Sequence, residues 1–226
     1  MLTKDCIPNQ ASFNPGAQSD AQCALIVLGQ NCYKYFKLAD SGTWAQRHNQ
    51  LTKKDPEKYS QNYTCHAWVQ EFLLVCTDRG EIMFCDHNAD FKLMLIDSPG
   101  PSFSIQRILA LKSEDFVIAD QSGSFAYFEP TNELRNPFKL LKSNLPVSVD
   151  YEEPKWSRYL EEQDSVYFPM TGMDQIGDYL IYTTSKRQML KMRIQKDKTD
   201  DFGKISYLTQ PFHRHKLAAV ATCMKQ

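Results

Sequence analysis

The sequence predicts an all-β fold built from one repeated four-stranded unit. Apolar runs of about five residues recur along the 226 residues, and no helical or coiled-coil pattern separates them. Each run ends in a turn-forming group and is followed by a second, amphipathic strand. The turns at Gly29, Gly80 and Gly123 are spaced by 51 and 43 residues, close to the roughly 40 to 45 residues of a propeller blade. These observations together predict an incomplete WD40-type β-propeller of about four blades plus one strand.

The stretch from Asn62 to Phe84 contains most of one blade. Its middle run, Phe72–Cys76, is apolar at every position. This is typical of a strand covered on both faces, as neighbouring blades would cover it. Gly80 then allows the positive φ that the reversal requires. With Asp90–Ile96 as outer strand, the second blade is expected at about residues 62–97.

The first blade is expected at about residues 6–49. Cys6–Phe13 is a weak strand, and Cys23–Leu28 is apolar enough to be buried on both faces. Cys32–Leu38 follows after a short turn, and Trp44–His48 is the expected outer strand.

The third and fourth blades are expected at about residues 103–142 and 164–209, with the next blade beginning at 216–223. The third consists of strands at 103–111, 115–119, 124–128 and 138–142. The fourth begins near Ser165–Pro169 and continues with strands at 179–184, 189–194 and 205–208.

Residues 144–163 are expected to form an inserted loop, because 64 residues separate Gly123 from Arg187. Exposed aromatic residues with a nearby arginine are enriched where proteins bind partners. The alternative is a loop that folds back onto its own blades. The loop residues proposed as protein-binding are Tyr151, Trp156, Arg158 and Tyr159.

One alternative fold fits the same strand pattern. Short strands at regular spacing also suit a β-sandwich, but the same internal order in every unit favours the propeller. The Trp-Asp pair that gives WD repeats their name is absent.

Four blades and a spare strand make an unfinished ring, and a ring stabilises its end blades by closing. We therefore expect packing against further propeller blades outside this chain.

The composition excludes several partners and sites. A net charge of -1 gives no electrostatic case for nucleic acid or an anionic membrane. No apolar run approaches the roughly 20 residues of a membrane span, and the first residues lack a signal-peptide core. Seven cysteines without a Cys-x-x-Cys pair predict reduced thiols, in the cytosol or a space continuous with it.

We predict no catalytic, cofactor-binding or metal-binding residues. There is no Gly-rich phosphate loop and no nucleophile elbow. His66 is expected to hydrogen-bond a turn, Trp68 to pack between blades, and Asp78 to bond turn amides, rather than to form a ligand pocket. His213 and His215 lack the third ligand that a metal site needs.

Several segments resemble the cilia- and flagella-associated protein 57 family, also called WD-repeat protein 65. The segments 61–68 and 75–84 look like one of its blades, and the residues around Phe13 resemble its Ser-Phe-Ser-Pro strand end. Residues 182–186, 207–208, 211–213 and 219–223 resemble later parts in the same order. The chain thus resembles an internal part of the family's WD-repeat propeller region.

The resemblance implies a non-enzymatic scaffold of the axoneme in the cilium or flagellum. Such proteins carry a long coiled coil beyond their propellers, sit on doublet microtubules and help assemble or anchor inner dynein arms, which supports cilium movement. The implied partners are inner-arm dynein, doublet-microtubule tubulin and other ciliary WD-repeat or coiled-coil proteins. The alternative is a generic WD-repeat propeller adaptor in a cytosolic protein complex.

A basic run in the fourth blade is the second proposed protein-binding site. Clustered positive charge attracts an anionic partner, such as the acidic surface of tubulin. An ordinary charged surface is the alternative. The residues proposed here are Lys186, Arg187, Lys191 and Arg193.

Overall fold

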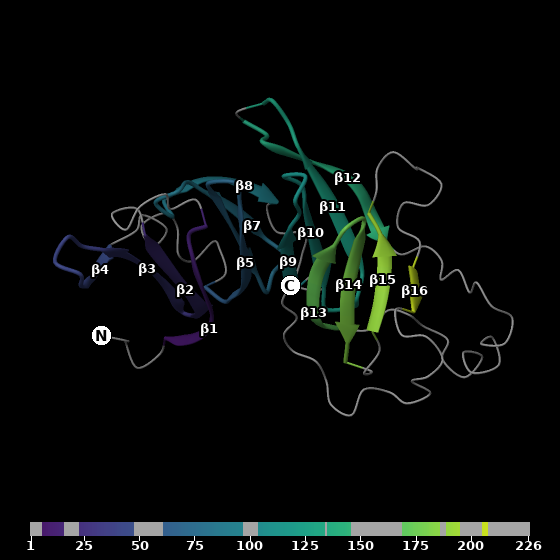
Figure 1. Ribbon diagram of the computed structural model, residues 1–226, viewed down its shortest axis with the longest axis horizontal. Coiled ribbons are helices and arrows are strands. Elements are labelled where there is room, and N and C mark those ends of the chain that lie inside the picture. Colours follow the sequence, from purple (N-terminus) through teal and green to yellow (C-terminus); the bar gives the residue numbers. More distant parts are fainter. Residues whose placement is uncertain are drawn as a thin grey trace, which may run out of the picture. The chain divides into compact units, whose positions relative to one another are not determined.

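The computed structural model describes residues 6–15, 23–47, 61–96, 104–133, 135–145, 169–185, 189–194 and 205–207. These residues contain sixteen strands in four antiparallel sheets of four strands each (Figure 1). In every sheet the strands neighbour one another in chain order. Four separate sheets of this connectivity confirm the predicted all-β propeller blades, and the two-sheet sandwich is wrong.

The chain divides into two compact units. The first consists of residues 1–117 and 128–139, and the second of residues 118–127 and 140–226. The boundary runs through the third sheet. Sheets 1 and 2 lie wholly within the first unit and sheet 4 within the second.

Among the described residues of sheet 1, one face is fully covered and the other only partly. Its second strand reads Ala-Leu-Ile-Val-Leu, but burial alternates along it, with Ala24, Ile26 and Leu28 buried and Leu25 and Val27 half-buried. Its strands are β1 (Ile7–Phe13), β2 (Ala24–Gln30), β3 (Cys32–Leu38) and β4 (Trp44–Arg47).

Sheet 2 is covered on both faces. Its second strand is buried at every position after Phe72, and its third strand is buried throughout. One face meets sheet 1, while Phe84 on the other face packs 6.2 Å from Phe138 of sheet 3 between ring centroids. The strands are β5 (Tyr63–Val69), β6 (Phe72–Thr77), β7 (Ile82–Cys85) and β8 (Phe91–Ile96).

Sheets 3 and 4 repeat the pattern of a buried second strand. β10 is buried along its whole length, and β14 at every position after Tyr179. The strands of sheet 3 are β9 (Ile105–Ala110), β10 (Phe116–Asp120), β11 (Phe125–Pro130) and β12 (Phe138–Leu145). Those of sheet 4 are β13 (Met170–Ile176), β14 (Tyr179–Thr184), β15 (Met189–Arg193) and β16 (Ile205–Tyr207).

One five-residue turn recurs between strands. The first residue's N–H donates to the carbonyl of the fifth, and the fourth residue's N–H donates to the carbonyl of the first, at 2.8 to 3.2 Å. The fourth residue has positive φ, from 60° to 90°. This is a hairpin turn closed by a residue in the left-handed region. It occupies Ala39–Thr43, Thr77–Glu81, Asp86–Asp90, Leu111–Asp115 and Asp120–Ser124.

Two expectations need correction. The first strand of sheet 4 is β13, after the segment 165–169 where it was expected. β13 contains Thr171, Gly172, Asp174 and Gln175, so it lacks the apolar alternation that identifies a strand in sequence. Its pairing with β14 is what makes this segment a strand.

The expectation of reduced thiols is wrong for two cysteines. Cys6 and Cys32 form a disulfide, with Cα atoms 4.8 Å apart. Sequence spacing could not show this, because the two cysteines are 26 residues apart and come together only when β1 pairs with β2. A Cβ on Gly29 would lie against the Ile7 carbonyl oxygen and 2.8 Å from the Pro8 Cα. The free cysteines in the described part are Cys23, Cys65, Cys76 and Cys85.

Candidate functional site

The structure describes two of the eight residues proposed as protein-binding, and it brings them together. Lys191 and Arg193 lie on β15, on the face that also carries Tyr179 of β14. Lys191 Nζ lies 5.2 Å and Arg193 Cζ 5.9 Å from the Tyr179 ring centroid. Both cations are half-buried and share one aromatic ring, an arrangement worth about 0.5–1 kcal/mol at exposed sites. Outside the described residues lie Tyr151, Trp156, Arg158, Tyr159, Lys186 and Arg187.

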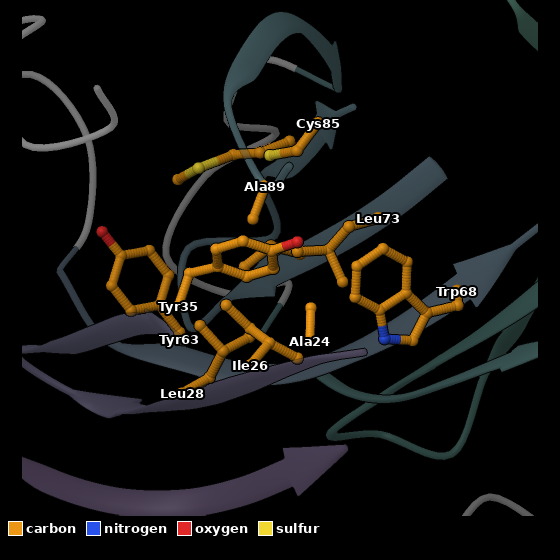
Figure 2. Close-up of a cluster of buried hydrophobic side chains, with 11 residues drawn as sticks. Ala24, Ile26, Leu28, Tyr35, Tyr63, Trp68, Leu73, Cys85 and Ala89 are labelled. Carbon is orange, nitrogen blue, oxygen red and sulfur yellow. The ribbon is translucent and has the colours of Figure 1, made fainter. Parts of the chain in front are cut away.

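The most extensive arrangement of described side chains is the seam between sheets 1 and 2 (Figure 2). Side chains from the inner face of sheet 1 pack against one face of sheet 2 and exclude water. Its core residues are Ala24, Ile26, Leu28 and Tyr35 from sheet 1, with Tyr63, Trp68, Leu73, Val75, Met83, Cys85 and Ala89 from sheet 2.

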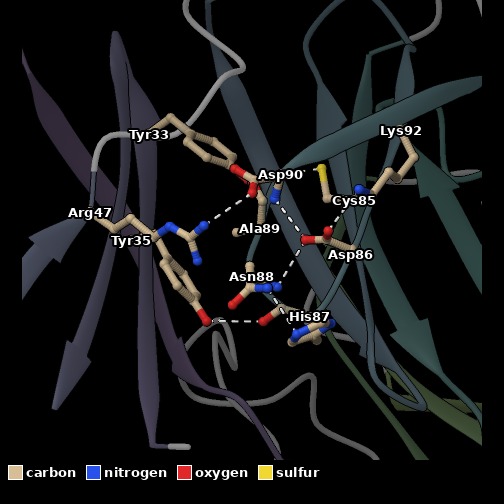
Figure 3. Close-up of polar contacts among 10 residues, drawn as sticks. All are labelled: Tyr33, Tyr35, Arg47, Cys85, Asp86, His87, Asn88, Ala89, Asp90 and Lys92. Carbon is tan, nitrogen blue, oxygen red and sulfur yellow. Dashed lines mark hydrogen bonds and ion pairs between the residues drawn. The ribbon is translucent and has the colours of Figure 1, made fainter.

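At one end of the seam, the Asp86–Asp90 turn of sheet 2 docks onto two tyrosines of sheet 1 (Figure 3). The Tyr35 hydroxyl donates to the His87 carbonyl at 2.9 Å, and the Tyr33 hydroxyl donates to the Ala89 carbonyl at 2.8 Å. Burial raises the pKa of Tyr35 to about 12, so its hydroxyl remains a donor at neutral pH. We call this arrangement the turn contact.

Charges surround the turn contact and hold its shape. Lys92 Nζ lies 2.8 Å from Asp86 Oδ2, and Arg47 Nη2 of sheet 1 lies 3.5 Å from Asp90 Oδ2. Partial burial alone would raise the pKa of Asp86. Hydrogen bonds from Lys92 and from the backbone N–H groups of Asp90 and Asn88 outweigh burial and hold this pKa below its usual 3.8. The carboxylate therefore stays ionised and organises the turn.

A second polar contact joins the first strands of the two sheets. The side chain of Gln10 on β1 makes two hydrogen bonds to the His66 backbone. Its Oε1 accepts from the His66 N–H at 2.9 Å, and its Nε2 donates to the His66 carbonyl at 3.4 Å. Ser12 Oγ lies 2.5 Å from His66 Nε2 and accepts from Trp68 Nε1 at 3.1 Å. Trp68 thus packs in the seam as expected, whereas His66 bonds a side chain of the other sheet instead of a turn. We call this the first-strand contact.

The pair of Ser12 and His66 resembles a nucleophile beside a base, but its surroundings suit a structural bridge. Burial lowers the pKa of His66 to about 4, too low for an effective base at neutral pH. The Ser12 oxygen already accepts from Trp68. In the described part of the chain, His66 Nδ1 has no hydrogen-bond partner that could orient the ring. The contact therefore fastens two sheets together.

The described residues contain neither a group of three or more His, Cys, Asp or Glu side chains placed to hold a metal ion nor a helix able to cross a membrane.

Sequence reasoning missed both contacts at the seam. Their partners are separated by 52 to 56 residues, so no local pattern connects them. The available signals were weak. Tyr33 and Tyr35 alternate on one strand, and Asp86 begins a turn-forming group, but neither identifies the other as its partner.

Comparisons with known proteins support the fold and a distant relationship. No protein-family model matches the chain. It is 23% identical over 209 residues to cilia- and flagella-associated protein 57 A of Tetrahymena thermophila. The match includes 89% of this chain but only 15% of that protein. The resemblance inferred from the sequence is thereby confirmed as a distant similarity.

Solved propellers have a similar fold at low identity. One is the β-propeller domain of Cps50 (Swd1) from Myceliophteria thermophila, with a TM-score of 0.56 and 13% identity. Another is the N-terminal part of BBS1 in complex with ARL6, with a TM-score of 0.54 and 12% identity. The chain covers 59% and 53% of these two chains, respectively.

Proposed function

We propose that this chain is a non-enzymatic WD-repeat scaffold of the ciliary axoneme. In this role it helps assemble or anchor inner dynein arms on doublet microtubules and so supports ciliary motility. The observation that carries the proposal is the similarity to cilia- and flagella-associated protein 57 A, which extends over 89% of the chain.

The geometry of the first unit suits a scaffold. Its polar groups at the seam are engaged in fastening one sheet to the next, through the turn contact and the first-strand contact. A rigid stack of blades holds surface residues in fixed positions, which is what an adaptor between larger assemblies requires. The Ser12 and His66 pair supports the non-enzymatic role, because its histidine is neutral and buried.

Localisation is the first test. The protein carrying a fluorescent tag, expressed in ciliated cells, is expected to concentrate along the axoneme and to remain there after detergent extraction. Its loss should reduce inner dynein arms and the beating of cilia. A tagged protein that stays in the cytosol and is extracted by detergent would refute the axonemal role and favour the cytosolic adaptor.

The basic surface of sheet 4 supplies a second test, directed at tubulin. Lys191 and Arg193 are held over Tyr179, so both present positive charge from one strand. The double variant Lys191→Glu and Arg193→Glu is expected to weaken co-sedimentation with microtubules about tenfold at low salt. Arg135→Glu, an exposed charge reversal in the turn before β12, is the matched control for Lys191→Glu alone. Equal loss in these two single variants would indicate a general charge effect and refute a specific site.

The segment 144–163, expected to be an inserted loop, supplies a third test, directed at axonemal protein partners. Trp156→Ala is expected to reduce recovery of inner-arm dynein components with the tagged protein, because aromatic anchors carry much of the energy of an interface. Circular dichroism should remain unchanged. A variant that loses solubility, or that recovers the same partners, would assign Trp156 to the protein's own packing.

A further inference from the structure

The face of sheet 1 that points away from sheet 2 is apolar and only partly covered, with four half-buried and two exposed side chains. The register aligns Phe13, Leu25 and Phe36 across three strands. Phe13 is 59% exposed, and Trp44 is 43% exposed and lies 6.0 Å from the Phe13 ring between centroids. We call this surface the open face, and it consists of Phe13, Leu25, Val27, Phe36, Leu38 and Trp44.

Each central position of the open face has a buried equivalent in sheet 2. Counted back from the turn after the third strand, Leu38 corresponds to Cys85 and Phe36 to Met83. The residue paired with Phe36 is Leu25, and the residue paired with Met83 is Val75. Val75, Met83 and Cys85 are at most 3% exposed because sheet 1 covers them, whereas their three equivalents are only half-buried.

The turn after β3 shows the same difference. Ala39–Thr43 has the hydrogen bonds and the positive φ of the Asp86–Asp90 turn, and it occupies the same place between third and fourth strands. Ala89 is fully buried in the turn contact. Its equivalent, Gly42, has no atom within 4 Å of the position where a Cβ would lie. The turn of sheet 1 therefore has the conformation seen in the turn contact, but no described residue lies against Gly42 as sheet 1 lies against Ala89.

From these equivalences we propose that the open face docks a further propeller blade of the same polypeptide, placed on sheet 1 as sheet 1 is placed on sheet 2. Sheets pack face to face about 10 Å apart, so the blade would cover Leu25, Phe36 and Leu38 together. Its third strand would bring hydroxyl or amide donors to the carbonyls of Asp40 and Gly42, the equivalents of His87 and Ala89. Lys34, paired with Val27, lies on the same face, and the aliphatic stem of a lysine can pack against apolar side chains.

Two observations favour a blade over other occupants. The strand β2 begins with a run of apolar residues like those of β6 and β10, whose residues are buried on both faces. The chain also covers only 53% to 59% of two solved propeller chains. This proposal is independent of the ciliary role, since it concerns the completion of the ring.

Site-resolved thiol labelling tests the proposal in the 226-residue chain and in the full-length gene product. Leu38→Cys introduces the residue found at the equivalent position of sheet 2, so it is a mild change. Ala45→Cys, on the opposite face of β4, is the exposed control, and native Cys85 is the buried reference. Short pulses of a thiol reagent are followed by mass spectrometry of peptides.

In the Leu38→Cys variant, the expected result is rapid labelling of the introduced thiol in the short chain and labelling slowed roughly tenfold or more in the full-length product. The thiol introduced by Ala45→Cys should react equally fast in both proteins. Equal reactivity of the Leu38→Cys thiol in both proteins would overturn the proposal. Protection in the short chain that rises with protein concentration would also overturn it, because a second copy of the chain would then be the occupant. If Leu38→Cys does not fold, Phe13→Cys at the exposed edge of the open face gives the same readout.

Discussion

Sheets 1 and 2 have the same strand order, the same type of turn after the third strand and similarly apolar second strands, yet they differ in how they are covered. In sheet 2, β6 is buried on both faces, whereas in sheet 1 burial alternates along β2. The apolar sequence of a strand indicates the environment to which the strand is suited, whereas the burial of its side chains indicates which neighbours it has. Where a uniformly apolar strand is buried on only one face, a further neighbour is indicated for the other face.

The largest expected effect comes from truncating equivalent residues in the two sheets. Met83→Ala should cost about 2–5 kcal/mol of unfolding free energy, because it leaves a closed cavity in the seam. Phe36→Ala should cost only about 1 kcal/mol despite removing a larger side chain, because its site is half-open. Urea denaturation followed by fluorescence measures both. Equal losses would mean that the open face is covered in solution.

The second effect is pH dependence at the first-strand contact, which joins the two sheets. The pKa of His66 is lowered from 6.5 to about 4, so the unfolded chain binds the proton more readily. The stability from neutral His66 is fully present above pH 6.5 and is lost as the pH falls towards 4, by about 3 kcal/mol at most.

The variant His66→Gln should remove this slope between pH 6.5 and 4, as measured by urea denaturation at a series of pH values. Asp86 provides an internal comparison, because its pKa lies below 3.8 and its contribution disappears only at lower pH. An unchanged slope in His66→Gln would assign the pH dependence to other groups.

A smaller effect is expected at the turn contact. Tyr35→Phe keeps the ring in the seam but removes the donor to the His87 carbonyl, at a cost of about 1 kcal/mol. The double variant with Tyr33→Phe should lose more than either single variant, since the second hydroxyl bonds a different carbonyl. Thermal unfolding measures these differences. No loss in the double variant would show that water replaces both donors.

The smallest effects concern the equivalent turn residues of the two sheets. Gly42→Ala should cost up to about 1 kcal/mol, because φ is +74° and the new methyl group meets no neighbour among the described residues. Ala89→Gly should be nearly neutral. Relief of an unfavourable φ of +60° is offset by loss of a buried methyl group worth about 0.8 kcal/mol. Thermal unfolding of both variants measures the difference, and a marked loss from Ala89→Gly would show that packing dominates at this position.

The sequence alone was sufficient for most strands and for the propeller class. The run at Phe72–Thr77, for example, is uniformly apolar up to Cys76 and is followed by Gly80, and both features act locally on the chain. The same reasoning missed β13, whose polar residues are held in a strand by pairing with β14. Of the candidate site, Lys191 and Arg193 could be found as a charge run, but Tyr179 beneath them could not.

Strand positions, turn residues and the repeated unit were therefore determined by the sequence, because period-two patterning and positive-φ residues act within a few residues of one another. Only the tertiary structure decided which faces are covered, that Cys6 meets Cys32, and that Ser12 meets His66 across 54 residues. The physical reason is that burial and side-chain pairing depend on chain segments that folding brings together in space. No local sequence pattern in one segment identifies the distant segment that it will contact.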